Sequence, residues 1–177
     1  EWDGRQVFIR IDGVDKLFYL WINGKYVGFS KNSRNAARFN ITRFLQPGTN
    51  VVAAEVYRSS DASFLEAQDM FRLPGIFRTV ALYSTPEVQI RDLVVIPDLT
   101  NNYQDGVLNI QTDVRNLGRK DAKGYTLTYS LYANPLYSDD NEEVKEAIYT
   151  SAPIDIKAGL CQSSTGTLTV KMPKQWS

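Results

Sequence analysis

The chain has 177 residues, of which 43% are hydrophobic, and its 20 basic and 20 acidic side chains give a formal net charge of zero. This balance excludes a broad basic surface for nucleic acid or anionic lipid, no apolar run is long enough to span a membrane, and the apolar fraction is enough to bury a core. The chain has no histidine and one cysteine, which excludes His-based catalysis, thiolate metal clusters and an internal disulfide.

The first half of the chain has the alternating pattern of β-strands, as in residues 5–11. The Asn23-Gly24 pair between two such runs predicts a type I′ hairpin, because both residues tolerate a positive φ. We expect Tyr19 and Trp21, on the strand before this turn, to lie in the core. The expected strands are 5–11, 17–22, 25–29, 51–57 and 79–84, with a short turn or helical bend at 40–45.

Thr85-Pro86 predicts a boundary between two modules, since proline interrupts strand pairing. After it, short alternating runs separated by turns are typical of an antiparallel β-sandwich. We expect residues 125–132 to form one strand, and we find no helical period of useful length. The expected strands are 88–96, 107–114, 125–132, 147–150, 154–156 and 166–170.

The connection at residues 59–78 is long for a compact domain and combines acids, arginines and phenylalanines. These residues are Asp61, Glu66, Asp69, Arg72, Arg78, Phe64, Phe71 and Phe77. The residues alone leave two interpretations open. The acids could pair with the arginines while the rings pack at the core edge, or the carboxylates could accept hydrogen bonds from sugar hydroxyls while the rings cover C–H faces.

Glycosidases use two carboxyl groups about 5 to 10 Å apart, normally brought together from distant segments. The short sequence spacing of Glu66 and Asp69 is therefore no evidence for such a pair. The sequence assigns no catalytic residue to this chain.

Several blocks carry a resemblance to a known family. They are FYLWINGKYVG at 18–28, the segments 33–39 and 44–50, SDASFLEAQDMFRLPGIFR at 60–78, and PKQWS at 173–177. In these blocks the chain resembles the N-terminal, non-catalytic part of β-galactosidases of glycoside hydrolase family 2.

The resemblance implies an all-β protein of two β-sandwich modules. Residues 1–85 would form a partial, galactose-binding-like jelly roll, and residues 86–177 an immunoglobulin-like sandwich. The first strands of the jelly roll would precede Glu1, and the catalytic barrel would follow Ser177. The parent enzyme would hydrolyse terminal β-galactosides with retention, while this chain alone would be inactive.

The resemblance also implies roles for the loop. The aspartate that matches Asp69 binds the galactosyl 6-hydroxyl and helps to ligate a sodium ion, and the intact enzyme could also use magnesium. Ala67 replaces an aspartate, and Phe71 a tryptophan, found in many relatives. The residues expected to hold the loop in shape are Glu66, Gln68 and Arg72, and those expected to pack are Phe64 and Phe71.

Two further functions stay open: a stand-alone carbohydrate-binding module and a purely structural tandem of β modules. The implied partners are the rest of the parent enzyme and a β-galactoside, with neither nucleic acid nor membrane. Exposed strand edges would favour pairing of two copies. The compartment stays open, cytoplasmic or periplasmic in a bacterium.

Overall fold

The computed structural model describes residues 2–66, 69, 71, 73–133 and 142–173. The chain divides into two compact units, Glu1–Pro86 and Glu87–Ser177. Strands dominate both units, which confirms the expected all-β class.

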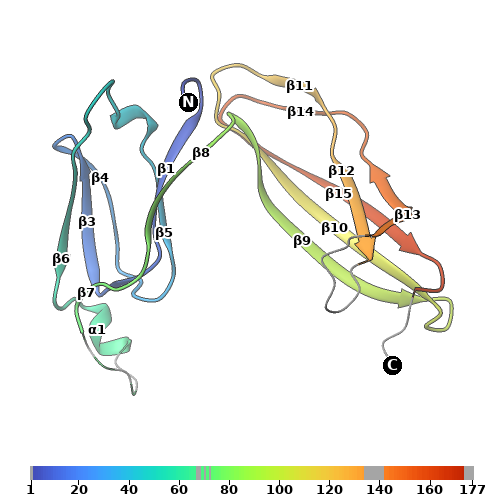
Figure 1. The fold of residues 1–177 in the computed structure, drawn as a ribbon, viewed down its shortest axis with the longest axis horizontal. Helices are drawn as coiled ribbons and strands as arrows, with labels where there is room; N and C mark the ends of the chain where they lie inside the picture. Colours follow the sequence, from blue (N-terminus) through green and yellow to red (C-terminus); the bar gives the residue numbers. More distant parts are fainter. Residues whose placement is uncertain (1, 67–68, 70, 72, 134–141, 174–177) are drawn as a thin grey trace. The chain divides into compact units, whose positions relative to one another are not determined.

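Within its described residues, unit 1 contains two three-stranded antiparallel sheets and a small two-stranded one (Figure 1). The first sheet consists of β5 (Ala37–Asn40), β1 (Gln6–Ile11) and β8 (Val80–Thr85) in spatial order, and the second of β4 (Lys25–Ser30), β3 (Leu17–Ile22) and β6 (Val52–Tyr57). The small sheet pairs β2 (Val14–Asp15) with β7 (Gly75–Ile76), and the short helices are η1 (Thr42–Phe44) and α1 (Ala62–Leu65).

The core of unit 1 lies between the two larger sheets. Alternate residues of β1 and β3 meet there, because successive side chains of a strand point to opposite faces. The buried cluster consists of Val7, Ile9, Ile11, Val14, Phe18, Leu20, Ile22 and Ile41. The predicted hairpin is confirmed: Asn23 and Gly24 have φ values of 51° and 74°. The Asn23 amide also donates to the carbonyl of Phe44 at 2.9 Å, which ties the turn to η1.

The prediction that Tyr19 and Trp21 lie in the core is wrong. The core-facing positions of β3 are the even ones, so both rings lie on the opposite face of the sheet. There Tyr19 stands within 5.7–6.3 Å, centroid to centroid, of four other rings: Trp21, Tyr26, Phe29 and Tyr57. We call these five residues the aromatic face. Its outer rings are half exposed, with Tyr26 at 50% and Phe29 at 49%.

In unit 2, the part of the chain that the structure describes forms one three-stranded and two two-stranded antiparallel sheets. The larger sheet consists of β15 (Cys161–Val170), β10 (Asp105–Asn116) and β9 (Val88–Thr100) in spatial order. The two pairs are β11 (Ala122–Tyr125) with β14 (Ile154–Ile156), and β12 (Thr128–Ala133) with β13 (Glu142–Thr150).

The core of unit 2 consists of two small buried clusters. They contain Ile110, Ala147 and Leu168, and Val114, Leu127 and Ile156. Thr112 is completely buried and accepts a hydrogen bond from the hydroxyl of Tyr129 at 2.9 Å, which satisfies a polar group inside the sheet packing.

The predicted single strand at 125–132 is wrong. The chain leaves its ladder with β14 after Tyr125 and enters a different ladder, with β13, at Thr128. Between the two strands, the backbone of Leu127 forms two hydrogen bonds with Ser151. The Leu127 N–H donates to the Ser151 Oγ at 3.0 Å, and the Leu127 carbonyl accepts from the Ser151 N–H at 2.9 Å. Leu127 is buried at this break, as the alternating pattern requires of it in a continuous strand. The alternation of the sequence is therefore the same with or without the break and could not show its position.

The one-turn helix α1 was also not expected from the sequence. A turn of this length has no room for the 3.6-residue period that marks a longer helix. None of the helices in the part of the chain that the structure describes has the length and apolar character of a membrane span.

Replacing Leu20, which is completely buried, by alanine should lower the free energy of unfolding of unit 1 by about 2–5 kcal/mol, since a cavity remains in the core. Urea denaturation followed by tryptophan fluorescence and circular dichroism measures this change. The control is Val51→Ala at a position that is 62% exposed, for which we expect a change within about 0.5 kcal/mol. Equal effects of the two substitutions would contradict the described core.

Candidate functional site

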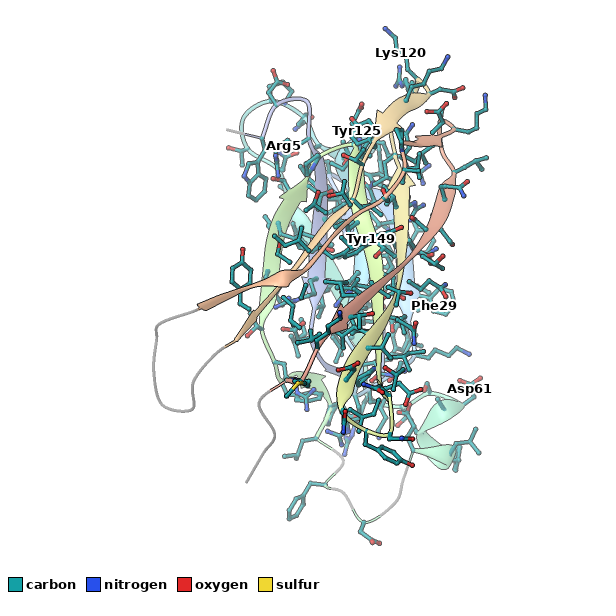
Figure 2. All side chains as sticks on the ribbon, turned by 90° about the vertical axis from the view of Figure 1, so that its right-hand side faces the viewer. Arg5, Phe29, Asp61, Lys120, Tyr125 and Tyr149 are labelled. Carbon is teal, nitrogen blue, oxygen red and sulfur yellow. The ribbon has the colours of Figure 1, made fainter. Side chains whose placement is uncertain are left out.

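The connection from β6 to β8 begins with the short helix α1, which Asp61 caps. The Asp61 side chain accepts a hydrogen bond from the Ala62 N–H at 2.9 Å, and the Ser63 hydroxyl accepts one from the Ser60 N–H at 2.8 Å. Figure 2 labels Asp61 beside this helix. These local bonds satisfy N–H groups that one helical turn leaves without partners.

Two polar contacts fasten the same segment to the residues that follow β4. The Lys31 ammonium lies 2.9 Å from the Asp61 carboxylate on the surface. The hydroxyl of Ser33, which is 1% exposed, donates a hydrogen bond to the carboxylate of Glu66. Asp61 therefore contacts Lys31 and Glu66 contacts Ser33, and within the described residues neither acid pairs with Arg78. Arg72, the other arginine of that interpretation, lies outside the described residues.

The far end of the connection returns to the sheets through β7. Residue Asp15 of β2 pairs with Gly75, and the Phe77 N–H donates to the Gly13 carbonyl at 3.2 Å. The Phe77 ring packs so closely on Gly13 that a Cβ there would lie 2.7 Å from the ring. Glycine at position 13 is what permits this approach.

Two guanidinium groups cover the Phe77 ring. Those of Arg34 and Arg78 each lie 5.3 Å from its centroid, within cation–π range. Arg78 also donates to the Arg34 carbonyl at 3.2 Å. This stack joins the segment after β4 to the segment before β8, so both ends of the long connection are held.

A cleft of about 490 Å³ opens beside these anchors within unit 1. It is lined by Asp15, Arg34, Asp69, Phe71, Leu73 and Phe77. Two carboxylates and one guanidinium thus share a cleft with three apolar side chains. Such a lining offers acceptors and a donor for hydroxyl groups together with apolar surface for C–H groups, as a sugar ring requires.

Of the predicted site residues, the structure describes Asp69 and Glu66 but not Gln68 and Arg72. Asp69 lies exposed in the cleft, and Glu66 lies at the foot of the loop on Ser33. Gln68 and Arg72 lie outside the described residues, as does Ala67.

The prediction that Phe64 and Phe71 pack is wrong for the described chain, in which they are 86% and 89% exposed. One helical turn buries one side chain, and in α1 it is Ser63.

Sequence reasoning missed the two charged cleft residues Asp15 and Arg34, and the apolar Leu73. A signal existed for the first, because Asp15-Lys16 places two charges between the apolar residues Val14 and Leu17. Arg34 follows a strand among polar neighbours and carries no such signal.

The contact between Lys31 and Asp61 shifts the titration of both groups. The hydrogen bond from Lys31, followed by that from the Ala62 N–H, lowers the pKa of Asp61 below its ordinary 3.8, and the same contact raises the pKa of Lys31 above 10.5. A lowered carboxyl pKa favours the folded state above the ordinary pKa. This contribution is lost as the pH falls through the folded pKa.

Replacing Lys31 by methionine should raise the pKa of Asp61 part of the way back towards 3.8, because the Ala62 N–H remains. Carboxyl-detected NMR titration measures the shift. Lys25→Met, which removes an exposed lysine of the hairpin, is the matched control and should leave the pKa of Asp61 unchanged. An unchanged pKa in the Lys31 variant would show that the contact is absent in solution.

Comparison with known proteins assigns the chain to a family. Residues 1–86 match the sugar binding domain of glycosyl hydrolases family 2. Over 180 residues the chain is 43% identical to a β-galactosidase of Priestia megaterium, an alignment that covers 100% of this chain and 16% of that protein. It is 36% identical to the β-galactosidase large subunit of Lactobacillus helveticus, covering 82% of this chain and 23% of that protein. The chain thus spans less than a quarter of the length of these relatives.

Solved structures show the same fold. A β-glucuronidase of Bacteroides uniformis matches with a TM-score of 0.83 at 24% identity, covering 99% of this chain and 21% of that one. A putative β-galactosidase of Bacteroides fragilis matches with a TM-score of 0.77 at 18% identity, covering 99% of this chain and 26% of that one. The resemblance seen in the sequence is confirmed: the chain belongs to glycosyl hydrolase family 2, and its residues 1–86 match the sugar-binding domain of that family.

Proposed function

We propose that this chain serves a β-galactosidase as its non-catalytic sugar-binding part, and that the loop bearing Asp69 contributes to the galactoside site. The observation that carries the proposal is the cleft, in which Asp69 stands beside Arg34 and apolar walls. The names of the relatives supply the substrate class, since both curated relatives described above are β-galactosidases.

In this proposal the chain helps to bind and orient the galactoside, and the glycosidic bond is cleaved in another part of the parent enzyme. The Asp69 carboxylate accepts a hydrogen bond from the galactosyl 6-hydroxyl, while Phe71, Leu73 and Phe77 exclude water from the C–H side of the ring. Hydrolysis with retention uses two carboxyl groups, which the rest of the parent enzyme supplies. That remaining polypeptide is the partner that closes the cleft.

The carboxylate of Asp69 is a suitable ligand for a sodium ion, but a sodium site needs several ligands. A carboxylate oxygen suits a hard cation, which takes several oxygen ligands. Within the described residues, no three His, Cys, Asp or Glu side chains gather as a metal site. In this proposal Asp69 supplies one ligand of a sodium or magnesium ion, and the rest of the parent enzyme supplies further ones.

A chimera tests the proposal. Residues 1–177 replace the matching segment of the Priestia megaterium enzyme, to which they are 43% identical. The chimera should cleave a chromogenic β-galactoside, whereas the isolated chain should not. Replacing Asp69 by asparagine should lower kcat/KM about 10- to 100-fold, since a hydrogen bond to a charged group contributes about 1.5–3 kcal/mol.

The control for this experiment is Asp98→Asn, which changes an exposed acid of unit 2 and should leave kcat/KM unchanged. A folded chimera without activity, or activity insensitive to the Asp69 substitution, would contradict the proposal. Cleavage by the isolated chain, with contaminants excluded, would contradict its non-catalytic role.

The aromatic face favours a second function, glycan binding by the chain itself. Its outer rings, those of Tyr26, Phe29 and Tyr57, are exposed on one side of a sheet, and two of them carry tyrosine hydroxyls. Such rings stack on the C–H faces of sugars while the hydroxyls bond to their oxygens.

Titration calorimetry of the isolated chain with galacto-oligosaccharides tests this second function. Binding at millimolar or lower concentration, lost in Tyr26→Ala and Phe29→Ala, is the expected result. Phe64→Ala is the control, because Phe64 is 86% exposed and lies outside the aromatic face. Absence of binding, or loss of binding in the control alone, would exclude it.

A further inference from the structure

Strand β9, the outer strand of its sheet in unit 2, has an apolar face that is left open (Figure 1). Residues directly opposite each other on neighbouring strands point to the same face of a sheet. The core-facing residues of β9 are therefore those that pair with the core-facing residues of β10: Ile90, Leu93, Val95 and Leu99. Their exposed fractions are 45–60%, whereas the β10 residues opposite the first three, Val114, Thr112 and Ile110, are 0–7% exposed. The layer that covers β10 therefore ends before β9.

The covering layer lies over β10 and β15. The hydroxyl of Tyr129 in β12 donates to Thr112 in β10 at 2.9 Å. The Tyr149 ring of β13 packs so closely on Gly166 of β15 that a Cβ there would lie 2.6 Å from the ring. The backbones of β13 and β14 also contact β15, and in the described part of the chain β9 has no comparable contact with β12. The sandwich is thus closed along β15 and open along β9.

The open side also has an unpaired strand edge. Strand β12 pairs with β13, and no other described strand pairs with it. Because β13 lies on the β15 side, the free edge of β12 faces the β9 side. A strand added to this edge would lie over the open face of β9, since the strands of two aligned layers run side by side. One strand would thus pair the free backbone groups of β12 and cover the apolar residues of β9.

The course of the chain gives the direction of such a strand. In β12, Leu127 packs with Val114 near the end of β10, and Leu131 packs on the cluster of Ile110, closer to the start of β10. Strand β12 therefore runs towards the end of the sandwich at which β10 begins. The polypeptide returns to that end after β15, where the Met172 N–H donates to the carboxylate of the first residue of β10 at 3.1 Å. A following segment that runs back from there is antiparallel to β12, as pairing in such a sandwich requires.

The relatives indicate where the segment comes from. The chain covers 16% of the Priestia megaterium β-galactosidase, so most of such a parent polypeptide lies outside it. A second copy of this chain fits less well, because the edge of β9 carries Pro97 and the charges of Arg91, Asp92 and Asp98. Proline and charged residues on an edge strand disfavour pairing with another molecule.

We infer that a segment of the parent polypeptide beyond Ser177 forms a strand on the free edge of β12 and packs its apolar side chains on Ile90, Leu93, Val95 and Leu99 of β9. This inference goes beyond the proposed function, since it concerns the interface of unit 2 with the remaining polypeptide. The segment has an apolar residue at every second position, because one of its faces meets β9. It extends unit 2 beyond residue 177, so the module predicted at 86–177 is completed by the parent enzyme.

Hydrogen exchange of the chimera described above, followed by mass spectrometry, tests the inference. Residues 128–133 of β12 should exchange at least about tenfold more slowly in the chimera than in the isolated chain, since the added strand bonds their free backbone groups. Val95→Asp should return this exchange in the chimera towards the rate of the isolated chain, because it places a carboxylate in an apolar contact.

Val94→Asp is the matched control. Val94 is the neighbour of Val95 on the opposite face of β9, and the two are 44% and 45% exposed. The control should leave the exchange of β12 in the chimera unchanged, and in the isolated chain the two variants should behave alike. Should V95D fail to fold by circular dichroism, V95T makes the same comparison with V94T as its control.

Three results would overturn the inference. They are equal exchange of β12 in the chimera and in the isolated chain, equal effects of the two substitutions in the chimera, and a dimer of the isolated chain in sedimentation that V95D dissociates. The last result would assign the open face to a second copy. If the chimera does not fold, the isolated chain extended by the residues that follow the aligned segment in the Priestia enzyme takes its place. None of these measurements depends on Asp69 or on galactoside cleavage, so the proposed function and this inference fail independently.

Discussion

The packing of Phe77 on Gly13 is the contact on which the site depends. It brings the end of the long connection back to β2, where Gly75 pairs with Asp15. The guanidinium groups of Arg34 and Arg78 cover the ring and join a third segment to it. Because the approach leaves no space for a side chain at position 13, glycine there is a steric requirement.

The other end of the connection is held by polar contacts. Ser33 is buried and gives Glu66 a hydrogen bond, while the Lys31 contact with Asp61 lies on the surface, where ion pairs contribute little. The Ser33 contact is therefore the stronger anchor of the two. With both ends held, the middle of the loop can present Asp69 to the cleft without being part of the core.

In unit 1, different residues form the core and line the cleft. The sheets bury an apolar core made by alternate residues of β1 and β3, and the cleft uses residues from the connections and from the short strand β2. Function carried by connections on a rigid scaffold is a common division in β proteins. The aromatic face lies on the other side of β3 from the core. The even-numbered residues of this strand pack in the core, and Tyr19 and Trp21 lie on the outer surface of the sheet.

The amino-acid pattern was sufficient for most of the longer strands, the Asn23-Gly24 hairpin and the all-β class, because alternation and turn chemistry act over a few neighbouring residues. It could not decide which face of β3 is buried, since both faces carry large, mainly apolar side chains: Tyr19 and Trp21 on one, and Phe18, Leu20 and Ile22 on the other. Nor could it bring Asp15 to the side of Asp69 across more than fifty residues of chain. Those choices follow from the pairing of β2 with β7 and from the stacking of the two sheets, which depend on contacts between distant segments and therefore exist only in the folded structure.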